Sequence, residues 1–335
     1  MDHTLILVIA VVAVALVFDF LNGFHDAANA IATIVVSKTL TPMQAVGLAG
    51  LANFIGYFTF GTAVAKMIGK GVVHVDQVTL LLLLGTLSGA IVWNILTWLL
   101  GLPTSSSHAL IGGLIGSALV AIGPKAVIWS GVAKIFSFII IAPFLGMLGS
   151  TIFTVIIIWL FHRATPRVAN SLFRKLQLVS ATFYSIGHGT NDAQKTMGII
   201  ALALLAAGYT TSFEIPKWTV LACYVAISLG TVFGGWRIVK TMGTSITKIR
   251  AMEGFCAESA AAAVLIGTQH MGIPVSTTHV IAGSIMGVGT VQNVGKVRWV
   301  TARKILWAWI LTIPAAAAVS ALTYLALAAL PVAKW

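Results

Sequence analysis

Two copies of one polar motif supply the residues best suited to bind a ligand. Each copy has a proline, then three hydroxyl residues starting two positions later, then a histidine. The copies are Pro103-Thr104-Ser105-Ser106-Ser107-His108 and Pro274-Val275-Ser276-Thr277-Thr278-His279. Hydroxyls that precede an apolar helix commonly cap it. Two such helix starts brought together would also offer hydroxyl and backbone N–H donors to a tetrahedral oxyanion.

A second repeated feature is an aspartate within an apolar segment. Asp26 lies in Gly23-Phe24-His25-Asp26-Ala27-Ala28-Asn29, and Asp192 lies in Gly189-Thr190-Asn191-Asp192-Ala193-Gln194-Lys195. In a lipid environment an ionised carboxylate costs about 2.5–3.5 kcal/mol on insertion scales. An aspartate that recurs at the same place in both copies therefore indicates function. Asn29 and Lys195 follow their aspartates by three residues, so on a helix they would share the same face.

Histidines complete the polar inventory without suggesting an enzyme. His108 and His279 end the two hydroxyl motifs, and this symmetric pair is predicted to shape the site. No histidine or cysteine spacing resembles a zinc site, no glycine loop resembles a nucleotide cradle, and no nucleophile-elbow pattern occurs. We therefore expect neither an enzyme nor a covalent cofactor.

The composition places these motifs in a membrane. Of the 335 residues, 59% are hydrophobic and 8% are charged, whereas about a quarter of a soluble protein is charged. A soluble fold of this size could not bury so much apolar surface. We expect an all-α polytopic membrane protein with about ten to twelve transmembrane segments, the first of them a retained span at 5–21.

Several apolar segments are too short to cross a bilayer alone. Residues 24–36 and 276–290 are examples, and both lie beside glycine or proline. Lipid tolerates a broken helix only where the freed backbone lines a protein cavity. These segments therefore predict broken or re-entrant helices at the repeated motifs. Segments 128–161 and 303–331 are long enough for a tilted span or a tight hairpin.

The repeats divide the chain into two halves. The matching histidines 108 and 279 lie 171 residues apart, and the matching aspartates 26 and 192 lie 166 residues apart. We predict a first repeat at 1–161, a basic linker at 162–175 and a second repeat at 176–335. Paired repeats with interrupted helices are typical of secondary transporters.

The net charge of +12 indicates topology rather than a nucleic-acid partner. Basic residues gather in three short connections between apolar segments, at 163–175, 237–250 and 296–304. Such clusters mark cytoplasmic loops, so we expect a multi-pass protein of the cell membrane with 162–175 in the cytoplasm. The first-half counterparts, near 69–82 and 125–133, carry few basic residues. The two halves are therefore predicted to have inverted topology.

Taken together, the motifs resemble those of the inorganic phosphate transporter (PiT) family. The resemblance rests on Asn22-Gly23-Phe24-His25-Asp26-Ala27-Ala28-Asn29-Ala30, on Gly187-His188-Gly189-Thr190-Asn191-Asp192 and on the paired Pro-x-Ser-[ST]-[ST]-His motif. It extends over essentially the whole chain. It implies two inverted repeats around a midplane oxyanion site, and import of inorganic phosphate by cation-coupled symport with alternating access.

The resemblance also assigns residues to this site. The substrate-binding residues would be Asn29, Ser105, Ser106, Ser107, Asn191, Lys195, Ser276, Thr277 and Thr278. The coupling ion or proton would use Asp26, Asp192, Glu258 and His25, and Asp26 and Asp192 would be the metal ligands if the ion is sodium. His25 stands where many members carry asparagine, and this variant resembles that of bacterial proton-linked or metal-phosphate permeases, whereas the extra carboxylate of Glu258 favours sodium. Sodium and protons both stay open as the coupling cation.

Other functions are compatible with parts of this pattern. Sulfate or another tetrahedral oxyanion would use the same hydroxyls and helix starts, and competition between phosphate and sulfate would distinguish them. A membrane-embedded enzyme would need a nucleophile–base pair or a metal site, and an anion channel would not accumulate its ion. The expected partners are phosphate, the coupling cation and the lipid bilayer, with a homodimer as an open alternative to a monomer.

Overall fold

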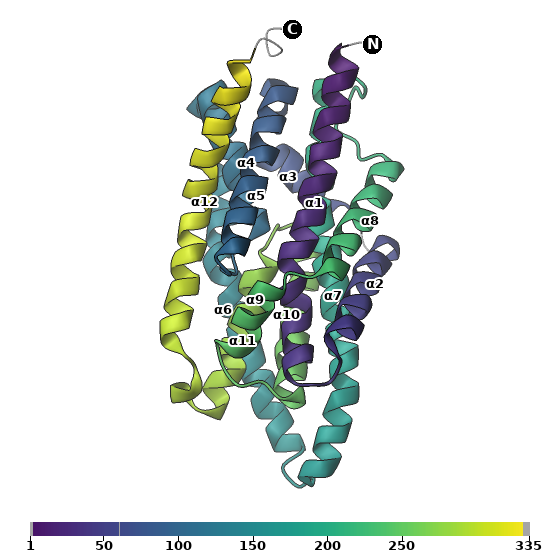
Figure 1. The fold of residues 1–335 in the computed structure, drawn as a ribbon, viewed down its shortest axis with the longest axis vertical. Coiled ribbons are helices and arrows are strands. Elements are labelled where there is room, and N and C mark those ends of the chain that lie inside the picture. Colours follow the sequence, from purple (N-terminus) through teal and green to yellow (C-terminus); the bar gives the residue numbers. More distant parts are fainter. Residues whose placement is uncertain (1–2, 60, 331–335) are drawn as a thin grey trace.

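The computed structural model describes residues 3–59 and 61–330, which are almost entirely helical (Figure 1). The α-helices are α1 (His3–Val36), α2 (Pro42–Ile55), α3 (Ala63–Gly71), α4 (Leu80–Leu99), α5 (Ser106–Ala121), α6 (Trp129–Leu160), α7 (Pro166–Ala206), α8 (Lys217–Phe233), α9 (Trp236–Thr244), α10 (Ala251–His270), α11 (Thr277–Gln292) and α12 (Trp299–Ala328). Short 3-10 helices are η1 (Gly56–Phe58), η2 (Val75–Gln77), η3 (Pro124–Ala126) and η4 (Val294–Lys296). The predicted all-α class is confirmed.

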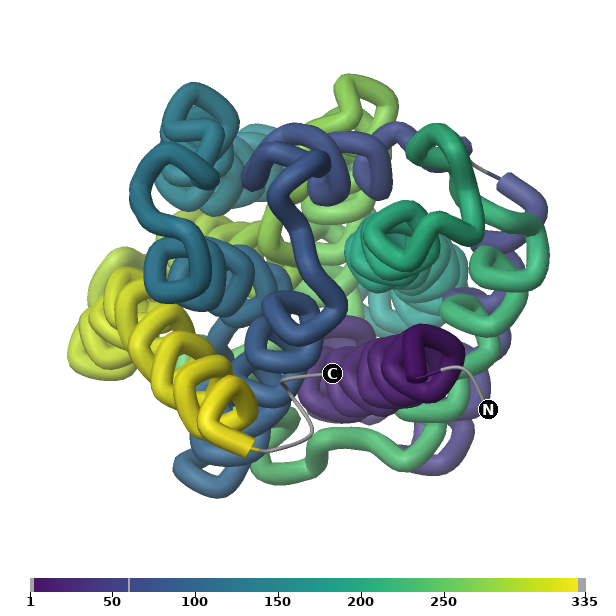
Figure 2. The backbone as a smooth tube through the Cα atoms, turned by 90° about the horizontal axis from the view of Figure 1, so that it is seen from above, coloured from purple at the N-terminus to yellow at the C-terminus, as the bar shows by residue number. Residues whose placement is uncertain are grey.

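Only some of these helices are long and apolar enough to cross a bilayer. Within the described residues these are α1, α4, α6 and α12, and the number rises to six if each bent helix pair counts as one span. One such pair is α8 and α9, which meet at 71°. The described residues therefore contain twelve α-helices but fewer complete spans. Seen along the long axis, α12 lies at the edge of the bundle (Figure 2).

One expected break is absent. Residues 24–36 were predicted to form a short separate segment, but they continue α1 without interruption. This prediction was wrong because polar residues interrupt the apolar pattern without interrupting the backbone. Their side chains are stabilised by neighbouring helices instead. Helix α7 is also continuous through its aspartate, from Pro166 to Ala206, and most of residues 162–175 lie in it.

The helix starts at the hydroxyl motifs agree better with expectation. Both α5 and α11 have 16 residues, too few to span a bilayer, and each begins inside the protein. The two long segments form single helices rather than hairpins, α6 with Pro143 inside it and α12 with Pro314.

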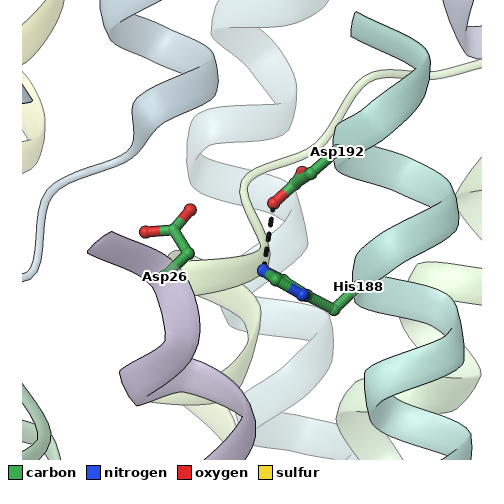
Figure 3. Close-up of side chains that lie close together, drawn as sticks. All are labelled: Asp26, His188 and Asp192. Carbon is green, nitrogen blue, oxygen red and sulfur yellow. Dashed lines mark ion pairs between the residues drawn. The ribbon is translucent and has the colours of Figure 1, made fainter. Parts of the chain in front are cut away.

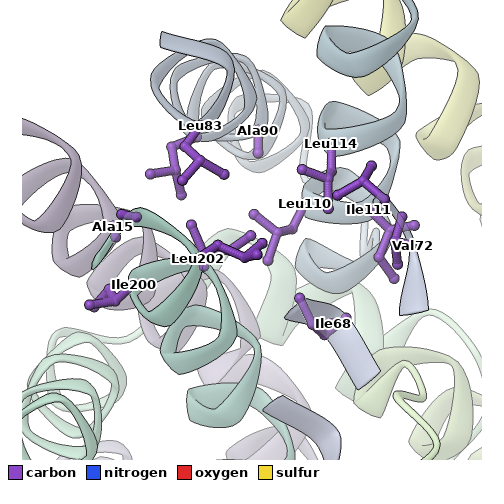
Figure 4. Packing of buried hydrophobic residues seen from close by; sticks show 14 of the residues in the cluster. Ala15, Ile68, Val72, Leu83, Ala90, Leu110, Ile111, Leu114, Ile200 and Leu202 are labelled. Atoms are coloured by element: carbon purple, nitrogen blue, oxygen red, sulfur yellow. The ribbon is translucent and has the colours of Figure 1, made fainter. Parts of the chain in front are cut away.

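Two apolar cores lie on either side of the repeated aspartates. The first core includes Ala15 of α1, Leu83 of α4, Leu110 of α5 and Leu202 of α7 (Figure 4). The second core includes Ala28 and neighbours from α1, and Tyr184 from α7. Along α1 the chain passes from the first core to the second, and along α7 it passes from the second to the first. The helices that carry the two aspartates therefore run in opposite directions, as inverted repeats require.

The two halves exchange their packing partners. The short helix α5 of the first half packs on α12 of the second, and α11 of the second half packs on α6 of the first. Glycines allow this contact: a Cβ at Gly116 would lie 2.0 Å from the Ala317 carbonyl oxygen, and one at Gly287 would lie 2.2 Å from that of Met147. The small-residue spacing predicted for helix packing is thus used between the halves.

Basic residues gather at one end of the molecule. Arg167 and Arg174 of α7 line one pocket with Arg250, which precedes α10. The backbone N–H of Arg298 donates to the Ile246 carbonyl at 2.9 Å, so the last two basic connections also adjoin. This end is opposite to the one where α1 begins and α12 ends (Figure 1).

Candidate substrate and ion site

The first hydroxyl of each motif caps its helix. Ser105 Oγ accepts a hydrogen bond from the backbone N–H of His108 at the start of α5, and Ser276 Oγ accepts one from that of His279 at the start of α11, both at 3.2 Å. Such an acceptor satisfies one of the N–H groups that a helix start leaves free. In this arrangement Ser105 and Ser276 serve their own helices.

The second hydroxyl of each motif binds the aspartate of its own half. Ser106 Oγ donates to Asp26 Oδ2, and Thr277 Oγ1 donates to Asp192 Oδ2, both at 3.1 Å. All four side chains are buried. Each aspartate is therefore held against the start of the short helix that follows it in the same repeat.

The third hydroxyl of each motif connects the two halves. Thr278 Oγ1 accepts a hydrogen bond from Asn29 Nδ2 at 2.8 Å, and Ser107 Oγ accepts one from Lys195 Nζ. Because Asn29 and Lys195 occupy matching positions, these two bonds are equivalent under the repeat. The hydroxyl of Thr278 also lies 3.4 Å from Asp26 Oδ1. Residues from both halves thus form one polar network.

Asp26 and Asp192 face a common space. Together with His188 they form a group whose potential ligand atoms all lie within 4.8 Å of one another (Figure 3). His188 Nε2 lies 3.3 Å from Asp192 Oδ2. Two carboxylates and an imidazole can hold a cation, and the carboxylate oxygens suit a hard ion such as sodium. The predicted pairing of the two aspartates in one site is therefore compatible with the geometry.

Lys195 forms the central positive charge of the network. Its ammonium group pairs with Asp192 and also donates to the Val275 carbonyl oxygen at 3.0 Å. Lys195 is 1% exposed and Asp192 is fully buried. A buried charge is tolerated when it is paired and its donors are satisfied, and here three acceptors surround the ammonium. They come from both halves of the chain.

The residues that precede the aspartates differ between the halves. His25 Nδ1 lies 2.9 Å from Asp26 Oδ1, and His25 Nε2 lies 3.2 Å from Thr97 Oγ1, which places the histidine between α1 and α4. The matching Asn191 is fully buried, and both its amide oxygen and its amide nitrogen lack a hydrogen-bond partner among the described residues. Asn191 therefore retains its full capacity to bind a ligand.

His108 and His279 pack against each other rather than against the aspartates. Their ring centroids lie 4.7 Å apart, and His279 stacks on Trp309 at 3.8 Å. Both rings are buried. They join the starts of α5 and α11 behind the hydroxyls, so the predicted role of shaping the site would be exercised through helix position.

Glu258 lies in a separate polar cluster. Its carboxylate accepts hydrogen bonds from Thr33 Oγ1 at 2.6 Å, Ser180 Oγ at 2.5 Å and Gln177 Nε2 at 3.1 Å. The structure gives it no hydrogen bond to either aspartate. The sequence grouped Glu258 with Asp26 and Asp192, whereas the structure places it between α1, α7 and α10, on the side of the second core.

Two participants were missed by sequence reasoning. His188 precedes Asp192 by four residues, a spacing that places both on one helix face and that could have identified it. Thr97 binds His25 across 72 residues of sequence, and its hydroxyl also accepts a hydrogen bond from Thr104 at 3.0 Å. Nothing in the local sequence of Thr97 marks it, because its role comes from the crossing of α1 and α4.

Fold and site together define a class of protein. Two inverted halves, short helices that begin inside the bundle and a buried polar network at their junction are the architecture of secondary membrane transporters. The chain belongs to the phosphate transporter family, whose family model matches residues 22–320.

Relatives of known name support this assignment. The chain is 51% identical to a probable low-affinity inorganic phosphate transporter of Rhizobium meliloti, with 97% of this chain and 98% of the relative covered. It is 45% identical to a protein of the same description from Bacillus subtilis, with the same shares covered. A solved structure described as the sodium-dependent phosphate transporter aligns with a TM-score of 0.85 at 26% identity, covering 96% of this chain and 98% of that one.

Proposed function

We propose that the protein imports inorganic phosphate together with a cation, by alternating access around the network at the starts of α5 and α11. The observation that carries this proposal is the pair of equivalent bonds, Asn29 to Thr278 and Lys195 to Ser107, which connect the halves. A bound phosphate would accept hydrogen bonds from donors of both halves, which at present donate to protein hydroxyls. Relative movement of the halves would then open the site to one side of the membrane or the other.

The charge of the site explains why a cation must enter with the substrate. Phosphate carries between one and two negative charges near neutral pH, and Asp26 and Asp192 add two more. Lys195 supplies one compensating positive charge. A sodium ion or protons on the Asp26–His188–Asp192 group would reduce the repulsion and free Lys195 and the hydroxyls for phosphate oxygens. The cation thereby completes the anion site.

The membrane potential favours this coupling if the transported complex is net positive. Each net positive charge moved inward gains about 2.3 kcal/mol per 100 mV, which corresponds to roughly fifty-fold accumulation. Import through a carrier of this kind follows the gradient of the cation, whereas a channel would allow only equilibration. The same network would serve another tetrahedral oxyanion, so sulfate is the substrate to compare.

The test is uptake of labelled phosphate into proteoliposomes under imposed sodium or proton gradients. We expect one gradient to drive accumulation, unlabelled phosphate to compete more strongly than sulfate, and Asp26→Asn or Asp192→Asn to abolish the gradient-driven part. Asp76→Asn is the matched control, because Asp76 is an exposed carboxylate outside the network. Uptake that ignores both gradients and both site variants would rule the proposal out.

Glu258 offers a way to identify the cation. We propose that its cluster with Thr33, Gln177 and Ser180 binds part of the coupling cation, separately from the two aspartates. Glu258→Gln keeps the side-chain size and removes the charge, so the cation concentration for half-maximal uptake should rise at least about tenfold. The expected rise appears in the sodium titration if sodium is the coupling ion and in the pH dependence if protons are. An unchanged titration with both cations would exclude Glu258 from coupling.

Orientation and assembly follow from the same proposal. With the basic end in the cytoplasm, residues 162–175 lie inside the cell and the protein is a multi-pass protein of the cell membrane. The division into repeats at 1–161 and 176–335 places one aspartate and one hydroxyl motif in each. A homodimer would add no residue to the network, because each chain supplies both halves.

A further inference from the structure

A second pocket lies at the basic end of the molecule, away from the buried network. It has a volume of about 760 Å³ and is bounded by the first turns of α7 and the start of α10. Three arginines line it: Arg167 and Arg174 from α7, and Arg250 from the residue before α10. The volume is in the range of small-molecule sites.

The charge of this pocket is poorly compensated. Within residues 3–59 and 61–330, none of the three arginines forms an ion pair with a carboxylate. The one carboxylate in the lining, Glu253, is 7% exposed, and it accepts hydrogen bonds from the Arg250 backbone N–H at 3.1 Å and from Gln292 Nε2 at 2.8 Å. Glu253 is thus already occupied as a helix cap, and the guanidinium groups are available to an anion.

The type of basic residue in the pocket is not explained by a general excess of positive charge at this end of the molecule. Lys175 and Lys248 belong to the same two basic connections but do not line the pocket, whose basic residues are all arginines. Arginine binds phosphate groups through paired parallel N–H donors, whereas lysine acts as a point charge. If the positive charges of the pocket only set the orientation in the membrane, lysine would serve there as well as arginine.

The lining also has an apolar part. Phe173, which is 1% exposed, and Met252 lie in the same pocket as the arginines. We propose that the pocket binds a soluble small molecule with several phosphate groups, and that a nucleoside triphosphate satisfies both the arginines and the apolar part. This site is separate from the transport network, and the inference does not depend on the proposed transport function.

Such a ligand would connect two helices of the second half. The start of α7 leads to Asp192 and Lys195, and the start of α10 leads to Glu258, whose carboxylate is already hydrogen-bonded to Gln177 and Ser180 of α7. A ligand held by arginines from both helix starts would therefore fix their cytoplasmic ends relative to each other.

The test is calorimetric titration of the purified full chain with ATP and with inorganic tripolyphosphate in EDTA, first without orthophosphate and then with saturating orthophosphate to occupy the transport site. We expect both probes to bind. Arg167→Gln, Arg174→Gln and Arg250→Gln should each weaken ATP binding at least about tenfold, because each removes a charge-assisted bond. The matched controls Lys175→Gln and Lys248→Gln remove the same charge nearby and should change it by less than about twofold.

Three outcomes would overturn the inference. These are failure of both probes to bind, an equal loss in the lysine controls, and full displacement by orthophosphate, which would place the probes in the transport site. Binding measured in nanodiscs with and without cardiolipin distinguishes a lipid headgroup from a soluble phosphate ligand. Cardiolipin binding with the same arginine dependence, while ATP and tripolyphosphate fail, would assign the pocket to a lipid headgroup and reject the soluble ligand.

Discussion

At the scale of single residues, the three hydroxyls of each motif have three different partners. Ser276 caps α11, Thr277 binds Asp192 in its own half, and Thr278 binds Asn29 in the other half. The sequence shows only a run of similar side chains. Ser105, Ser106 and Ser107 have the same three roles in the same order. The position of each hydroxyl at the helix start, rather than the type of side chain, therefore determines its partner.

This order makes a prediction about stability and transport. Ser105→Ala and Ser276→Ala should lower the free energy of unfolding by about 0.5–2 kcal/mol each, because a cap is lost, and should leave the KM for phosphate within about twofold. Thr277→Val keeps the shape but removes the bond to Asp192, so it should alter the cation dependence of uptake instead. Thermal unfolding and initial uptake rates measure the two effects. Loss of transport in Ser276→Ala with normal transport in Thr277→Val would contradict this division.

Lys195 gives a second prediction at this scale. Lys195→Met leaves Asp192 buried without its ion pair, a change that typically costs 3–5 kcal/mol when one partner of a buried pair is removed. We expect phosphate uptake below about a tenth of the wild-type rate and a clearly lower unfolding temperature. Lys125→Met is the control, since Lys125 is exposed. Wild-type uptake by Lys195→Met would exclude this lysine from the site.

At the scale of elements, helix continuity was harder to predict than helix existence. The apolar segments located almost every helix, and the proline-hydroxyl motif located the starts of α5 and α11. The uninterrupted paths of α1 and α7 could not be predicted, because the hydroxyls that bind Asp26 and Asp192 lie 80 and 85 residues away in the sequence. A pattern along one segment contains no information about such partners.

The exchanged helix contacts give a prediction about glycine. Gly116→Ala and Gly287→Ala place a Cβ within 2.2 Å of a backbone carbonyl oxygen, which the opposing helix cannot avoid without moving. We expect each to destabilise the protein by about 1–3 kcal/mol through overpacking. Gly267→Ala is the control: it lies in α10 with no atom within 4 Å of the added Cβ. That variant should be neutral or stabilising by up to about 1 kcal/mol. Equal unfolding temperatures for all three variants would contradict the close contacts.

At the scale of the whole molecule, orientation can be tested by labelling. Lys125→Cys lies at the end where α1 begins, and His162→Cys lies at the basic end beside the α6–α7 turn. A membrane-impermeant maleimide applied to intact cells should label the first variant and not the second until the cells are opened. The native Cys223 and Cys256 are buried and should not react. The reverse labelling pattern would place the basic end outside.

The sequence predicted the membrane environment and the repeat of the whole molecule better than it predicted the continuity of its helices. Scarcity of charge identified the membrane, and repetition identified the residues that meet at the centre. The surroundings of Glu258 could not be predicted, because the first half has no matching carboxylate and symmetry therefore offered no guide. Its partners Thr33 and Gln177 come from different halves of the chain.

The exchanged pairing of α5 with α12 also constrains how the protein is made. A ribosome completes the first half long before α12 emerges, so α5, with its glycine face and its buried helix start, must wait in the membrane without its final partner. Helix α12, which is synthesised well after the first half, completes the packing of α5. Premature termination before residue 299 would therefore leave α5 of the first half without its packing partner and would truncate the second half as well.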